Sequence, residues 1–163
     1  KENLNLASDA EIKEIMLLSI SLKNQEFDGK VIEAIARQNP HKLVFLLSFE
    51  NQQQLAVYHN KLYRTLWMKH DEIALKLQGY SLDEIWDSFI EQIALYEERA
   101  EQTDALSIED RLEIQDQILK LEKQIDKTEN TMWKEQQPKK KFALHTRLRE
   151  YQKKLEDLKH GKS

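Results

Sequence analysis

Two stretches of this 163-residue chain decide its architecture: IQDQILKLEKQIDKTENTM (residues 114–132) and LHTRLREYQKKLEDL (residues 144–158). Residues of mostly apolar character recur in both at alternating spacings of four and three, which is the a/d seam of a coiled coil. The seam of the first stretch consists of Ile114, Ile118, Leu121, Ile125, Thr128 and Met132. The seam of the second consists of Leu144, Leu148, Tyr151, Leu155 and Leu158. The spacing predicts two long helices that face each other.

A short connection allows these helices to fold back on each other, because only the segment 133–143 separates the two seams and it contains Pro138. When Met132 is paired with Leu144, and the following seam positions are paired in turn, the residue numbers of each pair add to 276. A constant sum is what an antiparallel register requires, and half of it falls on the proline. We therefore expect an antiparallel helical hairpin with its tip near Pro138.

Residues at the ends of the hairpin refine this prediction. Ser107 has the spacing of an N-cap relative to the first helical turn, so the helices are expected at about residues 107–135 and 139–160. At a rise of roughly 1.5 Å per residue, the arm would extend on the order of 40 Å. Trp133 and Phe142 flank the tip, where we expect the two rings to pack together and lock the turn.

The residues before the arm have mixed α and β patterns. Residues 12–22 alternate with period two and are continuously apolar in the middle, which predicts a strand internal to a sheet. A helix of about three turns, with Val31, Ile32 and Ile35 on its apolar face, is expected to stop at Asn39-Pro40. Further strands are expected at residues 42–49, 54–59, 61–67 and 73–77, the first two forming a hairpin.

A strong helical signal follows Gly79. Ser81 and Glu84 form a capping box, in which Glu84 is expected to accept from the Ser81 amide. Apolar residues at helical spacing then predict a helix that closes the sheet and runs to about Glu101. Asp83, Glu84 and Asp87 have the residue types of a carboxylate cluster, but their position in the first turns of the helix favours their interpretation as partners of the helix dipole.

These patterns predict an α+β protein: a small mixed or antiparallel sheet with one or two packed helices, followed by a C-terminal antiparallel coiled-coil hairpin. The charge distribution supports a boundary between residues 1–106 and 107–163. The first part carries 11 Lys/Arg against 18 Asp/Glu, and the second carries 14 against 11.

Composition excludes several classes of protein and site. With 40% apolar and 33% charged residues, the chain is neither disordered nor a membrane protein, and we expect a cytoplasmic protein without membrane contact. The absence of cysteine excludes disulfides and thiolate ligands. Three scattered glycines form no phosphate-binding loop, so no cofactor is expected.

Catalytic signals in the sequence are weak, and no catalytic or metal-binding residue is assigned. His70, followed by Asp71 and Glu72, has the residue types of a metal site, but a polar turn between strands explains it equally simply. Glu11 and Lys13 after Asp9 have the residue types of the Glu-x-Lys pattern of restriction-type nucleases, without an upstream acidic residue in a strand.

Basic residues are the candidate contacts for a partner or for nucleic acid: Lys139, Lys140, Lys141, Arg147 and Arg64. Residues 134–163 carry ten Lys/Arg against four Asp/Glu, which favours contact with phosphates, although a solvated helix face has the same composition. Arg64 alternates with Leu62 and Leu66 in its predicted strand, so it either pairs with a carboxylate of the closing helix or reaches solvent from an edge strand.

Three stretches carry a family resemblance: LYRTLW (residues 62–67), GYSLDEIW (79–86) and FIEQIA (89–94). Together with the charged coiled-coil tail, they resemble an uncharacterised bacterial family of small proteins that is catalogued as a domain of unknown function. The resemblance implies a gene near superfamily-two helicases and modification methyltransferases of the restriction or phage-defence kind. It also implies a further N-terminal segment, and it supplies no catalytic residues.

Two functions remain open from the sequence. The preferred one is a non-enzymatic accessory or adaptor protein that binds a protein partner, or a second copy of itself, through the arm. The alternative is a nuclease-like or nucleic-acid-binding protein that uses the basic arm.

Overall fold

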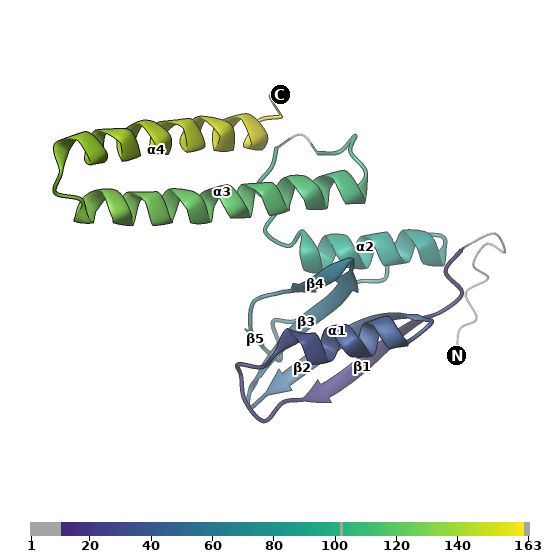
Figure 1. Ribbon diagram of the computed structural model, residues 1–163. Helices are drawn as coiled ribbons and strands as arrows, with labels where there is room; N and C mark the ends of the chain where they lie inside the picture. Colours follow the sequence, from purple (N-terminus) through teal and green to yellow (C-terminus); the bar gives the residue numbers. More distant parts are fainter. Residues whose placement is uncertain (1–10, 102, 162–163) are drawn as a thin grey trace. The chain divides into compact units, whose positions relative to one another are not determined.

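A computed structural model describes residues 11–101 and 103–161 of the chain (Figure 1). The chain divides into two compact units, residues 1–96 (unit 1) and residues 97–163 (unit 2). The helices and strands follow one another in the order β1, α1, β2, β3, β4, β5, α2, α3 and α4. The first seven belong to unit 1, and α3 and α4 belong to unit 2.

Unit 1 is built around a five-stranded mixed sheet. Its strands are β1 (Ile15–Ser21), β2 (Lys42–Phe49), β3 (Gln52–His59), β4 (Lys61–Arg64) and β5 (Met68–Lys69). The strand order is β1-β2-β3-β4, with β5 paired to β3 as well. β1 and β2 are parallel, because α1 (Gly29–Gln38) crosses over between them, and the other pairs are antiparallel.

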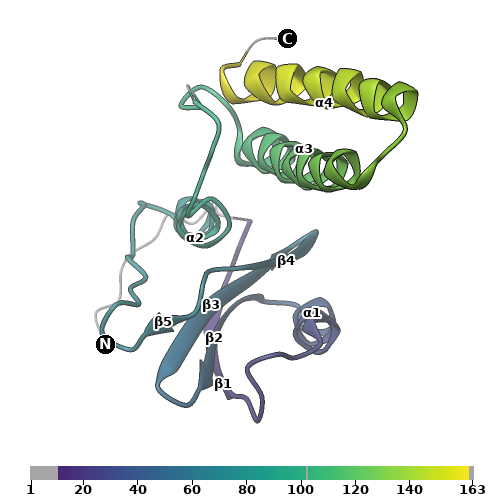
Figure 2. The same ribbon diagram turned by 90° about the vertical axis from the view of Figure 1, so that its left-hand side faces the viewer.

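Helices cover both faces of this sheet, with α1 on one side and α2 (Leu82–Ala94) on the other (Figure 2). The face under α1 carries a buried apolar cluster of Ile32, Leu43, Phe45, Leu47 and Ala56. α2 contributes a broad apolar stripe of Ile85, Trp86, Phe89, Ile90 and Ile93, all of them buried. The alternation of side chains along β2 and β3 supplies both faces, which explains why β2 is almost continuously apolar and why β3 is apolar in its middle, from Leu55 to Val57.

The expected α+β class is confirmed, but several details of unit 1 differ from the sequence prediction. The strand expected at residues 61–67 ends at Arg64. β1 is an edge strand and not an internal one, since its only strand partner among the described residues is β2. Residues 73–77 form no strand. α2 ends at Ala94 and not near Glu101. In the capping box, the Ser81 hydroxyl accepts from the Glu84 backbone amide as predicted. The Glu84 carboxylate, however, accepts from the Tyr80 backbone amide at 2.6 Å and not from the Ser81 amide.

Unit 2 contains the predicted helical hairpin, made of α3 (Ile108–Lys134) and α4 (Pro138–Lys159), which lie side by side and are joined at one end (Figure 1). Ser107 is the N-cap of α3, and its hydroxyl accepts from the Asp110 amide at 3.2 Å. All eleven seam residues are buried or half-buried, while most of the other residues of the two helices are exposed. Of the helices in the part of the chain that the structure describes, none has both the length and the apolar character that a membrane crossing requires.

Candidate functional site

Basic and aromatic side chains that do not belong to the seam lie at the tip of the hairpin. α3 carries Trp133 in its last turn, and α4 begins with Pro138 followed by Lys139, Lys140, Lys141 and Phe142. We call Trp133, Lys139, Lys140, Lys141 and Phe142 the tip cluster. Trp133 is 75% exposed and Phe142 is 72% exposed, so the prediction that these rings lock the turn by packing together is wrong.

A cation lies close to one of the exposed rings. The Lys141 Nζ atom is 5.8 Å from the centroid of the Trp133 ring, within the range of a cation–π interaction. α4 also lacks a side-chain cap at its N-terminus and has no acidic residue in its first turn. The lysines therefore meet the positive end of the helix dipole without a carboxylate in that turn, although the Glu135 carboxylate lies just before it and accepts from the Gln137 amide at 3.1 Å. The three lysines give this end of the arm an excess of positive charge.

The structure does not bring all the predicted basic residues together. Arg147 is exposed on α4, in the same unit as the lysines of the tip cluster. Arg64 belongs to unit 1, where it is exposed at the end of β4, and its guanidinium carbon lies 5.0 Å from the centroid of the Phe27 ring. Of the two interpretations of Arg64, this placement fits a side chain that reaches solvent from an edge strand.

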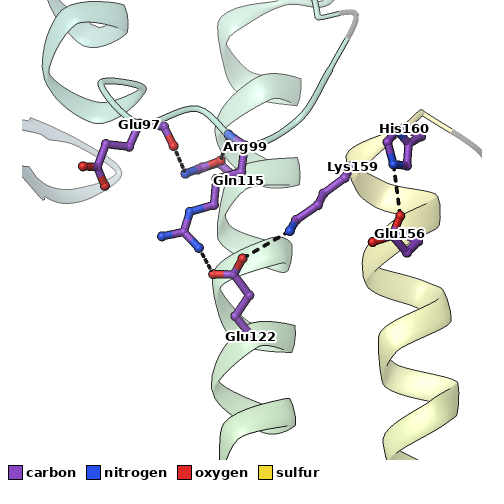
Figure 3. A network of polar contacts seen from close by, with 7 residues as sticks. All are labelled: Glu97, Arg99, Gln115, Glu122, Glu156, Lys159 and His160. Carbon is purple, nitrogen blue, oxygen red and sulfur yellow. Dashed lines mark hydrogen bonds and ion pairs between the residues drawn. The ribbon is translucent and has the colours of Figure 1, made fainter.

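The opposite end of the hairpin holds a network of polar contacts within unit 2, which we call the base network (Figure 3). The Gln115 side chain makes two hydrogen bonds to the backbone of the segment that leads into α3. Its Nε2 atom donates to the Glu97 carbonyl, and its Oε1 atom accepts from the Arg99 backbone amide, each at 3.1 Å. Gln115 is buried, so these two bonds satisfy polar atoms that would otherwise be costly.

Charged side chains complete the base network and tie α4 to it. The Glu122 carboxylate on α3 pairs with the Arg99 guanidinium, and its other oxygen lies 3.7 Å from the Lys159 Nζ atom. The backbone takes part as well, because the Glu101 amide donates to the Lys159 carbonyl at 2.7 Å. The last turn of α4 is thus held to both α3 and the segment before it.

Two titratable groups at this end have shifted pKa values. The pKa of Glu98 is lowered, first because the Arg111 side chain hydrogen-bonds its carboxylate. The pKa of His160 is raised, first by its hydrogen bond to Glu101 and further by Glu156, at distances of 2.9 and 3.0 Å. Sequence periodicity places Gln115 and Glu122 on one helix but does not find this network, because its partners between Glu97 and Glu101 lie outside regular structure.

Unit 1 presents a second surface that the sequence did not reveal. β1 exposes three consecutive apolar residues at the sheet edge: Met16 (40%), Leu17 (62%) and Leu18 (37%). Such residues on an edge strand are suited to contact with another chain. The segment that leads into β1 is held by the Asp83 carboxylate on α2, which accepts hydrogen bonds from the Glu11 and Ile12 backbone amides at 3.0 and 2.9 Å.

The weak catalytic signals do not converge. His70 lies in a turn, as the simpler interpretation predicted, with one ring nitrogen 2.9 Å from the Gln53 side-chain oxygen. Asp9, which precedes Glu11 and Lys13 in the nuclease-like pattern, lies outside the described residues. Across residues 11–101 and 103–161, no group of three or more His, Asp or Glu side chains is placed to hold a metal ion.

Comparison with known proteins assigns the chain to a family. No curated protein and no solved structure was found to match it. A family model described as "Domain of unknown function (DUF4391)" matches residues 1–155, which is nearly the whole sequence. The chain therefore belongs to the DUF4391 family of domains of unknown function.

Proposed function

We propose that this protein is a non-enzymatic accessory or adaptor that acts by protein–protein contact, within a bacterial restriction or phage-defence system associated with a helicase or a modification methyltransferase. The observation that carries the proposal is the edge of β1, where Met16, Leu17 and Leu18 are exposed and where β1 pairs with β2 alone among the described strands. A further strand added at this edge would bury these side chains and satisfy the backbone.

The arm supports the same role. Because α3 and α4 direct their apolar seam residues toward each other, their outer faces are free to present charged side chains to a partner. An open hollow on α3, lined by Lys127, Asn130, Thr131, Lys134 and Glu135, lies on such an outer face. The proposal therefore has two contact surfaces, one on each unit.

Affinity purification of the tagged chain from its native host tests the proposal. We expect a helicase or methyltransferase to co-purify, and we expect Leu17→Lys to abolish its capture because a charge would be buried at the edge. Leu77→Lys is the matched control, since Leu77 is 71% exposed in the same unit but outside the strands. Photo-crosslinking residues placed at Leu17 and Thr131 identify which unit touches the partner.

A result without such a partner would contradict the proposal. If neither a helicase nor a methyltransferase is captured, or if Leu17→Lys and Leu77→Lys capture equally while neither position crosslinks, neither surface mediates the contact. Circular dichroism of both variants confirms that the substitutions leave the fold intact.

A further inference from the structure

We propose that the tip cluster binds single-stranded nucleic acid, with bases stacked on Trp133 and Phe142 and phosphates held by Lys139, Lys140 and Lys141. This activity goes beyond the adaptor role and does not depend on it. The argument has three steps: the tip residues do not serve the fold, the charge of the arm is concentrated at the tip, and the two kinds of side chain fit one chemistry.

The tip aromatics are not needed for helix pairing. Near the tip the seam is formed by Thr128, Met132, Leu144 and Leu148, which are buried or half-buried. Trp133 and Phe142 lie off the seam and keep about three-quarters of their surface in water. Exposed tryptophan and phenylalanine gain nothing from the hydrophobic effect until something covers them.

The tip lysines do not serve the fold either. Three consecutive lysines in the first turn of α4 face the positive end of its dipole, where acidic residues are the stabilising choice. They belong to a longer stretch, residues 136–149, that holds five Lys/Arg and no Asp/Glu. All five of these basic side chains are exposed: Lys139, Lys140, Lys141, Arg147 and Arg149.

The charge of unit 2 is polarised along the arm. Residues 97–126, which form most of α3 and the part of the base network that precedes α4, carry ten Asp/Glu against four Lys/Arg. A polyanion is therefore attracted to the tip and repelled from the base. This pattern favours an anionic ligand and favours the tip over the base as the place where it binds.

Exposed rings beside lysines fit single strands better than other polyanions. A single strand offers unpaired bases that stack on aromatic faces and phosphates that attract ammonium groups. Duplex bases are already stacked, and an acidic peptide uses the lysines but has no need of the flat rings. Lys141, which already lies over Trp133, is placed to contact a phosphate while the ring receives a base.

Fluorescence anisotropy with a labelled twelve-nucleotide oligothymidylate at 50 mM salt tests the proposal on the whole chain. We expect binding that weakens with salt with a log–log slope of about −2, as three neutralised phosphates on a single strand require. Trp133→Leu and Phe142→Leu keep an apolar side chain but remove the stacking face. Each is expected to weaken binding by roughly 5- to 150-fold, the equivalent of ~1–3 kcal/mol per stacked base.

A pair of charge-matched variants separates a tip site from general attraction. The first variant replaces three tip lysines by glutamate: Lys139→Glu, Lys140→Glu and Lys141→Glu together. It should weaken binding at least as much as a ring variant. The control variant also replaces three exposed lysines of the same two helices by glutamate: Lys120→Glu, Lys153→Glu and Lys154→Glu together. It changes the net charge by the same amount and should retain most of the binding. Because all the altered side chains are exposed, circular dichroism should show folded helices in every variant.

Several outcomes would overturn the proposal. They are absence of binding at 50 mM salt, equal losses in the two charge variants, unchanged affinity in both ring variants, and a duplex of the same length that binds as tightly as the single strand. Tighter tip-dependent binding of polyglutamate or of anionic phosphatidylserine vesicles would reassign the tip to a protein or a membrane. None of these results bears on partner capture through Leu17, so the two proposals fail independently.

Discussion

Glu98 and Arg111 show how a charged pair can contribute to the stability of the arm. The Arg111 Nε and Nη2 atoms lie 3.0 and 2.6 Å from the two Glu98 carboxylate oxygens, and the side chains are only 15% and 13% exposed. A bidentate pair that is largely shielded from water is stronger than a solvent-exposed ion pair. Removing one partner leaves the other charge partly buried, which costs more than the bond itself was worth.

Glu98→Gln should therefore destabilise unit 2 at neutral pH, by about 1–3 kcal/mol in the free energy of unfolding. The lowered pKa of Glu98 means that its contribution is fully present above the unfolded pKa, near the ordinary value of 4.5, and is lost as pH falls through the folded pKa. Urea denaturation followed by circular dichroism at pH 7 and at pH 3 measures both effects. Glu113→Gln, at an exposed position of α3, the helix that carries Arg111, is the control, and an equal loss in both variants would contradict the role of the pair.

His160 should respond to pH in the opposite sense. Its raised pKa means that the contacts with Glu101 and Glu156 stabilise the protein fully below the unfolded pKa of about 6.5 and weaken as pH rises through the folded pKa. Proton NMR of the His160 ring should give a pKa above 6.5 in the parent chain and a lower one in Glu101→Gln. Since the ring is exposed, a titration that Glu101→Gln does not move would show that the contact is absent in solution.

At the scale of elements, pattern strength decides how much the sequence reveals. The bounds of α3 and α4 agree with their predicted ranges within two residues, because a heptad seam, an N-cap serine and a proline mark them independently. β1 was wrongly placed inside the sheet because an apolar run does not distinguish a buried strand from an exposed edge. The segment 73–77 alternates like a strand, but Gln92 on α2 binds the Lys76 backbone amide and carbonyl instead.

The candidate sites follow the same rule. The basic stretch of α4 could be predicted from composition, whereas the exposure of Trp133 and Phe142 depends on how the hairpin closes and could not. The base network was missed because it joins a helix to an irregular segment, and the position of such a segment follows from tertiary contacts alone.

Alanine substitutions in the seam of the hairpin should cost most stability at the positions that are most deeply buried. Ile118 is fully buried, so Ile118→Ala removes apolar contacts and leaves a cavity that should cost about 2–5 kcal/mol. The neighbouring Leu119 is 38% exposed, and Leu119→Ala should cost much less. Thermal unfolding followed at 222 nm compares the two variants, and equal losses would show that the helices do not face each other through this seam.

At the scale of the whole molecule, the chain joins two units that are stabilised in different ways. Unit 1 buries a sheet between two helices, and unit 2 buries a seam between two helices. The edge of β1, which carries the adaptor proposal, lies on unit 1, whereas the tip cluster and the second adaptor surface on α3 lie on unit 2 at different residues. A loss of one activity is thus expected to leave the other measurable.

The division into units predicts two separable unfolding transitions, and tryptophan placement allows each to be observed. Trp86 is 3% exposed in unit 1, so unfolding of that unit should change its fluorescence strongly, whereas Trp133 is already 75% exposed and should report little. α3 and α4 together hold 49 of the 72 helical residues that the structure describes, so ellipticity at 222 nm reports mainly on unit 2. Ile118→Ala should lower the midpoint of the ellipticity transition in urea and leave the fluorescence midpoint unchanged. If both midpoints moved together, the chain would unfold in one cooperative transition. Only then would a loss of stability in unit 2 also lower the midpoint of the fluorescence transition, which reports on unit 1.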